Sequence, residues 1–138
     1  MTSERGQVTV MVLGLAIMSL AIAGLAVDGT RAFLLRRTLQ NASDAASLAG
    51  ASEINRADYY GSGGRDIALA PEEAARSARE YLALRRIEAR VSVDVSENDV
   101  RLVLRGSSNT LFLALIGVSE VPVAVESNAA PVSGDLPP

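Results

Sequence analysis

The chain has 138 residues, a formal net charge of −3, and neither cysteine nor histidine. The length suits one small domain beside an apolar segment, and the acidic balance gives no indication of a nucleic-acid partner. The two missing residue types exclude disulfides, thiolate and histidine metal ligands, and Ser-His or Cys-His nucleophilic catalysis. We therefore expect no enzymatic activity, no cofactor and no metal site.

Residues 6–27 form a run without a charged side chain. As a helix this run is about 33 Å long, enough to cross a hydrocarbon layer of about 30 Å. Two other interpretations stay open: a buried helix of a soluble protein, and a cleavable secretory signal, for which Ala21-Ile22-Ala23 offers a cleavage site. We interpret the run as a retained membrane anchor, with the side chains Gly6, Val8, Met11, Leu13, Leu15, Ile17, Leu20, Ile22, Leu25 and Val27.

Beyond the run, one apolar stripe has residues spaced three and four apart: Ala32, Leu35, Leu39, Ala42, Ala46 and Ala49. This spacing is typical of one helix face, off which polar residues such as Ser43 mostly lie. No proline occurs before Pro71, so we expect one continuous helix from about residue 7 to about residue 56. The small side chains permit close packing, either on the chain's own domain or on another subunit.

Residues 58–70 contain Gly61-Ser62-Gly63-Gly64 and are predicted to form a flexible loop. A phosphate-binding loop would have a preceding strand and a following Lys-Ser/Thr pair, which this segment lacks. Pro71 then begins a predicted helix that ends at about residue 86. The carboxylate pair Glu72 and Glu73 falls in its first turn, where a structural role at the helix terminus explains it.

Two segments with alternating apolar residues, 89–96 and 100–105, predict a β-hairpin with one buried face. The turn lies at Glu97-Asn98-Asp99, and a turn role also explains the pair Asp94 and Asp99. A third predicted strand covers residues 120–127. Its Pro122 cannot donate a ladder hydrogen bond, which places the strand at a sheet edge.

Between the second and third strands, residues 107–110 are expected to cap a short helix over residues 111–116. That helix is apolar almost all round. It therefore lies in the core, or it touches a partner or the membrane surface, and a core position is the most common of these.

The order of elements predicts an α+β fold: a long N-terminal transmembrane helix continuing into a small domain with a three-stranded antiparallel sheet and one or two further helices. We divide the chain into an N-terminal segment with the transmembrane helix (1–27), the extramembrane continuation of that helix (28–57), a glycine-rich loop (58–70), a small α+β domain (71–128) and a disordered tail (129–138).

Three motifs in the N-terminal third carry a resemblance to a known family. They are Ala26-Val27-Asp28, Leu39-Gln40 and Asp44-Ala45-Ala46-Ser47-Leu48-Ala49-Gly50-Ala51. With these motifs, residues 5–51 resemble the TadE/TadG-like proteins of tight-adherence (Tad, or Flp) pilus assembly, and the architecture resembles that of type IV pilins and pseudopilins. The resemblance implies a pilin-like domain and a single-pass minor pilin-like or accessory subunit, without enzymatic activity. The implied partners are the membrane and, through the N-terminal helix, other pilus-assembly subunits.

The resemblance also implies that the C-terminal domain lies outside the cytoplasmic membrane. Counting arginines alone gives the opposite orientation, because Arg31, Arg36 and Arg37 outnumber Arg5. Met11 departs from the pattern of processed pilins, which have glutamate at the fifth position after the cut, and this favours the uncleaved TadG-like members. An alternative function is an extracytoplasmic binding module unrelated to pili, secreted or membrane-tethered.

Overall fold

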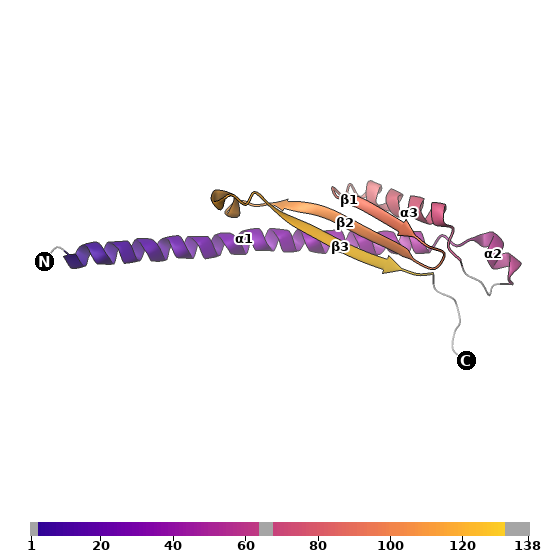
Figure 1. Ribbon diagram of the computed structural model, residues 1–138, viewed down its shortest axis with the longest axis horizontal. Helices are drawn as coiled ribbons and strands as arrows, with labels where there is room; N and C mark the ends of the chain where they lie inside the picture. Colours follow the sequence, from indigo (N-terminus) through magenta and orange to yellow (C-terminus); the bar gives the residue numbers. More distant parts are fainter. Residues whose placement is uncertain (1–2, 64–67, 132–138) are drawn as a thin grey trace, which may run out of the picture. The chain divides into compact units, whose positions relative to one another are not determined.

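The computed structural model describes residues 3–63 and 68–131. Its elements are the helices α1 (Ser3–Ala51), α2 (Arg56–Gly61) and α3 (Pro71–Leu84), the strands β1 (Arg90–Val95), β2 (Val100–Asn109) and β3 (Glu120–Ala129), and the 3-10 helix η1 (Leu113–Ile116). The predicted α+β fold is confirmed, with a three-stranded antiparallel sheet in the order β1-β2-β3 (Figure 1). The chain divides into two compact units, Met1–Leu35 with Ser107–Pro122 and Arg36–Gly106 with Val123–Pro138.

Helix α1 is uninterrupted, as the absence of proline predicts (Figure 1). It is the one helix in the described part of the chain that is long and apolar enough to cross a membrane. It ends at Ala51, whereas the stripe predicted helix to about residue 56. The difference has a tertiary cause: Ile54 forms an isolated antiparallel bridge with Leu69, which requires extended backbone where the helix would continue.

The segment predicted as a flexible loop, residues 58–70, is partly helical, and this prediction was wrong for its first residues. Helix α2 covers Arg56–Gly61, and the rings of Tyr59 and Tyr60 pack edge to face with their centroids 5.5 Å apart. The backbone that favours glycine occurs only after this helix, where Gly63 has a φ of +66°. Gly64 of the predicted motif lies outside the described residues, and so do residues 132–138 of the predicted tail.

The core of the second unit lies on β2. Val100, Leu102 and Leu104 alternate along the strand and are fully buried, as the predicted hairpin requires. The pairing is antiparallel, for example with Val93 opposite Leu102. Ala51, Leu69 and Ala74 join Val100 in one cluster of buried residues.

Strand β1 departs from the prediction of a hairpin buried on one face. Val91 is 41% exposed, and Val93 and Val95 are only half-buried. The reason is position, because β1 is an edge strand and has a neighbouring strand on one side only. Strand β3 lies at the other edge, as Pro122 predicted, and Pro122 itself is exposed.

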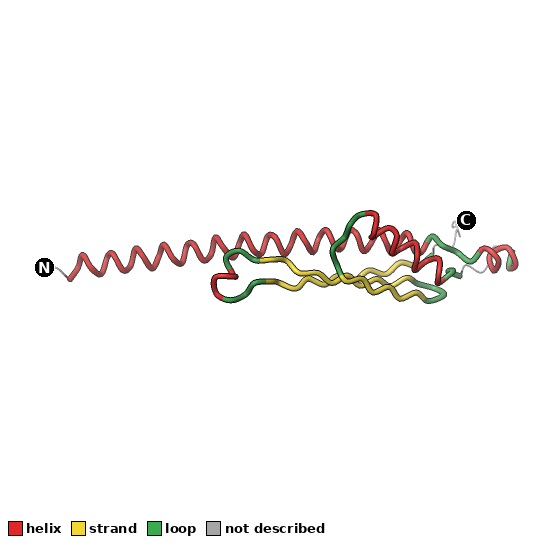
Figure 2. The backbone as a smooth tube through the Cα atoms, turned by 90° about the horizontal axis from the view of Figure 1, so that it is seen from above, coloured by secondary structure: helices red, strands yellow, loops and turns green. Residues whose placement is uncertain are grey.

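The segment between β2 and β3 also differs from the prediction. Strand β2 runs on to Asn109, so residues 107–109 are strand and do not cap a helix. The helix itself is a single 3-10 turn over Leu113–Ile116 with no buried residue, not a core helix over residues 111–116. Figure 2 shows it in the loop that joins the two long strands.

Candidate membrane and assembly site

The first half of α1 presents an apolar surface to its surroundings. All the side chains assigned to the anchor are exposed, from 41% for Val27 to 76% for Met11, and Gly6 is exposed too. Soluble proteins rarely leave a contiguous apolar surface of this extent in water, so this surface suits a contact with lipid or with other apolar helices.

Gly24 and Asp28 are the exceptions, being the only buried residues between positions 6 and 31, a stretch that the structure describes throughout. They are four residues apart and therefore lie on the same helix face. At Gly24 the Phe112 side chain lies directly on the backbone: a Cβ atom added there would be 2.5 Å from both Cβ and Cγ of Phe112. Glycine is thus required for this contact.

The Asp28 carboxylate binds the backbone of the same loop. Its Oδ1 accepts the N–H of Leu111 at 2.8 Å, and its Oδ2 accepts the N–H groups of Phe112 at 2.9 Å and of Leu113 at 2.8 Å. The first N–H groups of a helical turn have no partner within the turn. Asp28, from a distant part of the sequence, supplies the acceptors that residues 107–110 were expected to provide.

Asp28 lies directly after the uncharged run and is itself 2% exposed. Burial raises the pKa of its carboxyl, but the N–H donors of Leu111, Leu113 and Phe112, together with the Arg31 guanidinium, outweigh this effect and lower the pKa below its ordinary value. The carboxylate is therefore ionised at neutral pH and places a negative charge at the start of a helical turn, where it is favourable.

The sequence contains a signal for this loop contact that the motif resemblance did not interpret. The three-and-four spacing of the stripe begins at Ala32. Continued backwards in steps of four, it reaches Asp28 and then Gly24. An acidic residue on the apolar face of a helix is expected to have buried hydrogen-bond donors as partners, because an unpaired buried charge is costly.

In the second unit, the later part of α1 packs against its own domain through small residues. Of the predicted stripe, Leu39, Ala42 and Ala46 are buried and Ala49 is half-buried, while Ala32 and Leu35, in the first unit, are half-buried. Gly50 allows close approach, because a Cβ atom there would lie 3.0 Å from the carbonyl oxygen of Ala74 and 3.2 Å from Cγ1 of Val100.

Polar residues also line this packed face. The Ser43 hydroxyl is buried and lies 2.6 Å from the hydroxyl of Ser127 on β3, although the stripe placed Ser43 among the off-face polar residues. The amide of Gln40 donates to Oδ1 of Asp44 at 2.8 Å and to the carbonyl of Glu126 at 3.1 Å. The buried face is therefore wider than the apolar stripe, and Ser43, which pairs with β3, extends it.

Three large apolar side chains of α1 after the uncharged run stay exposed: Phe33, Leu34 and Leu48. Leu48 belongs to the third motif, in which Ala45 is half-buried. Since the small-residue face is occupied by the chain's own domain, these exposed side chains are the ones free to meet another subunit.

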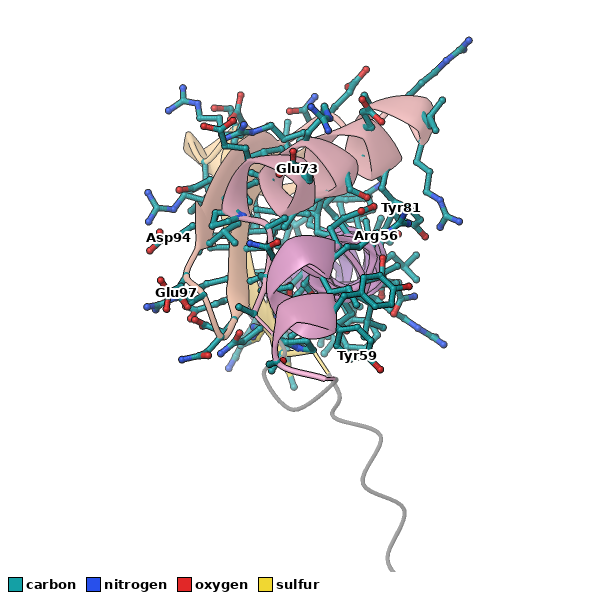
Figure 3. All side chains as sticks on the ribbon, turned by 90° about the vertical axis from the view of Figure 1, so that its right-hand side faces the viewer. Arg56, Tyr59, Glu73, Tyr81, Asp94 and Glu97 are labelled. Carbon is teal, nitrogen blue, oxygen red and sulfur yellow. The ribbon has the colours of Figure 1, made fainter. Side chains whose placement is uncertain are left out.

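The carboxylates singled out in the sequence do not form a site. Asp94 and Glu97 project outward from the β1–β2 hairpin, apart from Glu73 on α3 (Figure 3). The Ser96 hydroxyl is in hydrogen-bonding contact with the Asp99 carboxylate, which supports a turn role. Within residues 3–63 and 68–131, no group of three Asp or Glu side chains is placed to hold a metal ion.

Comparison with known proteins finds a family similarity in the N-terminal segment. Residues 6–53 match the model of the Tad family, described as Flp pilus-assembly TadE/G-like. The match covers the uncharged run, Asp28 and the packed small-residue face, so the resemblance indicated by the three motifs is confirmed. No curated protein and no solved structure matches the chain.

Proposed function

We propose that this chain is a single-pass, membrane-anchored minor pilin-like or accessory subunit of a Tad (Flp) type pilus or a related secretion apparatus. The observation that carries the proposal is the coincidence of the Tad match with α1. Within the matched residues, the first half of the helix has an exposed apolar surface. In the second half, motif residues such as Leu39 and Ala46 are buried against the small domain.

The subunit acts by helix packing. Residues 6–27 cross the cytoplasmic membrane and pack against apolar helices of neighbouring subunits. Further along α1, the stripe is occupied by the chain's own domain, so subunit contacts use the other side of the helix, where Phe33 and Leu48 are exposed. Van der Waals packing of such helices needs no catalytic group or cofactor.

The C-terminal domain is proposed to lie outside the cytoplasmic membrane, as the family resemblance implies. The chain has no cysteine, so a single Leu84→Cys substitution, at a side chain that is 85% exposed, gives a unique label. A membrane-impermeant maleimide should modify this residue in intact spheroplasts. Modification only after lysis would place the domain in the cytoplasm, as the arginine count does.

Single-cysteine crosslinking in the piliated host tests the assembly role. Leu48→Cys is exposed and should crosslink to another pilus-assembly subunit, whereas Ser43→Cys, on the buried face of the same helix, should not. Deletion of the chain should reduce piliation. If piliation were intact after deletion and Leu48→Cys captured no pilus or assembly protein, the proposal would fail.

Intact-mass analysis of the exported protein separates the anchor from the alternative of a secreted binding module. Retention of residues 1–23 supports the anchor, and their loss after Ala23 would show a cleaved signal peptide. Cleavage of the signal, together with unchanged piliation after deletion of the chain, would favour the binding module.

A further inference from the structure

We propose that the loop of residues 111–118, between β2 and β3, inserts into the boundary of the membrane that α1 crosses and forms a second apolar contact with lipid. The inference rests on the proposed anchoring of residues 6–27. It adds a membrane-binding element in a part of the chain outside the Tad match, which ends at residue 53.

The side chains of the loop suit lipid. Leu115 is 81% exposed and Ile116 is 76% exposed, and Leu111 and Val118 are exposed as well. No charged residue occurs from Gly106 to Ser119. A cluster of exposed apolar residues without charges is typical of a surface that is covered in the working state of a protein.

The contacts of the loop set its depth. Phe112 rests on Gly24, three residues before the end of the uncharged run, which corresponds to about 4.5 Å along the helix. Asp28, the first residue after the run, holds the backbone of the same loop. Interfacial elements bury their apolar face about 5–10 Å into the boundary between headgroups and acyl chains, and the loop lies close to the shallow end of this range.

Most backbone N–H groups of the loop have acceptors within the protein, which suits a medium poor in water. Asp28 accepts three N–H groups, and carbonyl groups of the same unit accept most of the others. The N–H groups with these partners belong to Thr110, Leu111, Phe112, Leu113, Leu115, Gly117 and Val118. Irregular backbone enters lipid only where its polar groups are satisfied, and here the protein provides acceptors for these seven N–H groups.

Lipid is the favoured occupant because the loop continues the surface of the anchor. Figures 1 and 2 show the turn of η1 at the end of β2 and β3, beside α1, and the contact through Phe112 is made within the uncharged run itself. A membrane that surrounds residues 6–27 therefore meets Leu115 and Ile116 without any further partner.

Tryptophan fluorescence can test the proposal, because the chain contains no tryptophan. The full chain is reconstituted in lipid nanodiscs with Ile116→Trp as the reporter and, in a second variant, Leu115→Trp. Leu84→Trp serves as an exposed control on α3, and Leu15→Trp reports the anchor. We expect blue-shifted emission for the loop reporters, and loss of intensity when the lipids are brominated near the headgroup end of the acyl chain. Leu84→Trp should show neither effect.

The outcomes separate the loop from the anchor. If Leu15→Trp is quenched by lipids brominated deep in the acyl chain while both loop reporters emit as in water, the loop inference is wrong and the anchor stands. Blue-shifted loop emission without quenching would mean that protein covers the loop, which also overturns the inference. If Leu15→Trp is not quenched, the anchoring itself fails, and the loop inference fails with it.

Discussion

Gly24→Ala is expected to detach the loop of residues 111–118 from α1. Glycine in a helix interior usually costs about 0.5–1 kcal/mol relative to alanine, so this substitution would ordinarily stabilise a helix. At this position the new Cβ atom would be 2.5 Å from Cβ and Cγ of Phe112, a separation that real structures do not tolerate. The phenylalanine is held at its own backbone and cannot simply rotate away, so the loop must move.

The magnitude follows from the cost of overpacking, about 1–3 kcal/mol. The stabilisation of the helix does not offset this cost for the loop, because α1 stays helical whether or not the loop is attached. At 1.4 kcal/mol for each factor of ten, the open state of the loop becomes roughly 5- to 140-fold more populated. Gly14→Ala is the matched control, since a Cβ atom at Gly14 has nothing within 4 Å.

Hydrogen exchange of the full chain in nanodiscs measures the effect, because the amides of Leu111, Phe112 and Leu113 lose their Asp28 acceptor when the loop detaches. These amides should exchange faster in Gly24→Ala than in the unsubstituted chain, and their exchange rates should be unchanged in Gly14→Ala. In a Phe112→Gly background, Gly24→Ala should add little, because all the side-chain atoms of residue 112 that the new Cβ atom would meet are gone. Equal exchange rates in the Gly24→Ala and Gly14→Ala variants would refute the reasoning.

Three further predictions concern α1, and exchange of the relevant amides measures each of them. Leu39→Ala should destabilise the second unit by about 2–5 kcal/mol, seen at the β2 amides, because the side chain is buried, while Leu84→Ala at an exposed position should have little effect. Gly50→Ala should destabilise the same unit by about 1–3 kcal/mol through contact with the Ala74 carbonyl and Val100, whereas Gly61→Ala enters open space and should not. Asp28→Ala should speed exchange at residues 111–113 more than Asp28→Asn, because the asparagine keeps one acceptor oxygen; equal effects would argue against the carboxylate contacts.

Local periodicity was sufficient to predict the elements in which buried and exposed positions alternate regularly. The uncharged run and the stripe predicted a long helix, and alternation in residues 100–105 predicted the buried face of β2. Pro122 predicted an edge strand, because the missing N–H has a direct consequence for pairing. Each of these signals depends on residues close together in sequence.

The predictions that were wrong depended on partners distant in sequence. Alternation in β1 predicted buried valines, but Val91 is exposed on a strand that lies at the edge of the sheet. Helix propensity after Ala51 was overridden by the bridge between Ile54 and Leu69. The serine on the packed face, Ser43, is compatible with burial only because Ser127 on β3 faces it.

Asp28 shows why a motif can be recognised without its physical role being understood. As part of Ala26-Val27-Asp28 it marks the end of the uncharged run, and a charged residue there needs no explanation beyond the membrane boundary. Its burial and its three N–H contacts give it a second role, which is to bind the loop between β2 and β3. That loop is distant in sequence, so the motif alone does not indicate the role. Gly24, one turn earlier on the same face, admits Phe112, so the two residues together hold the loop beside the end of the uncharged run. A substitution at either position should therefore leave α1 helical and still release the loop.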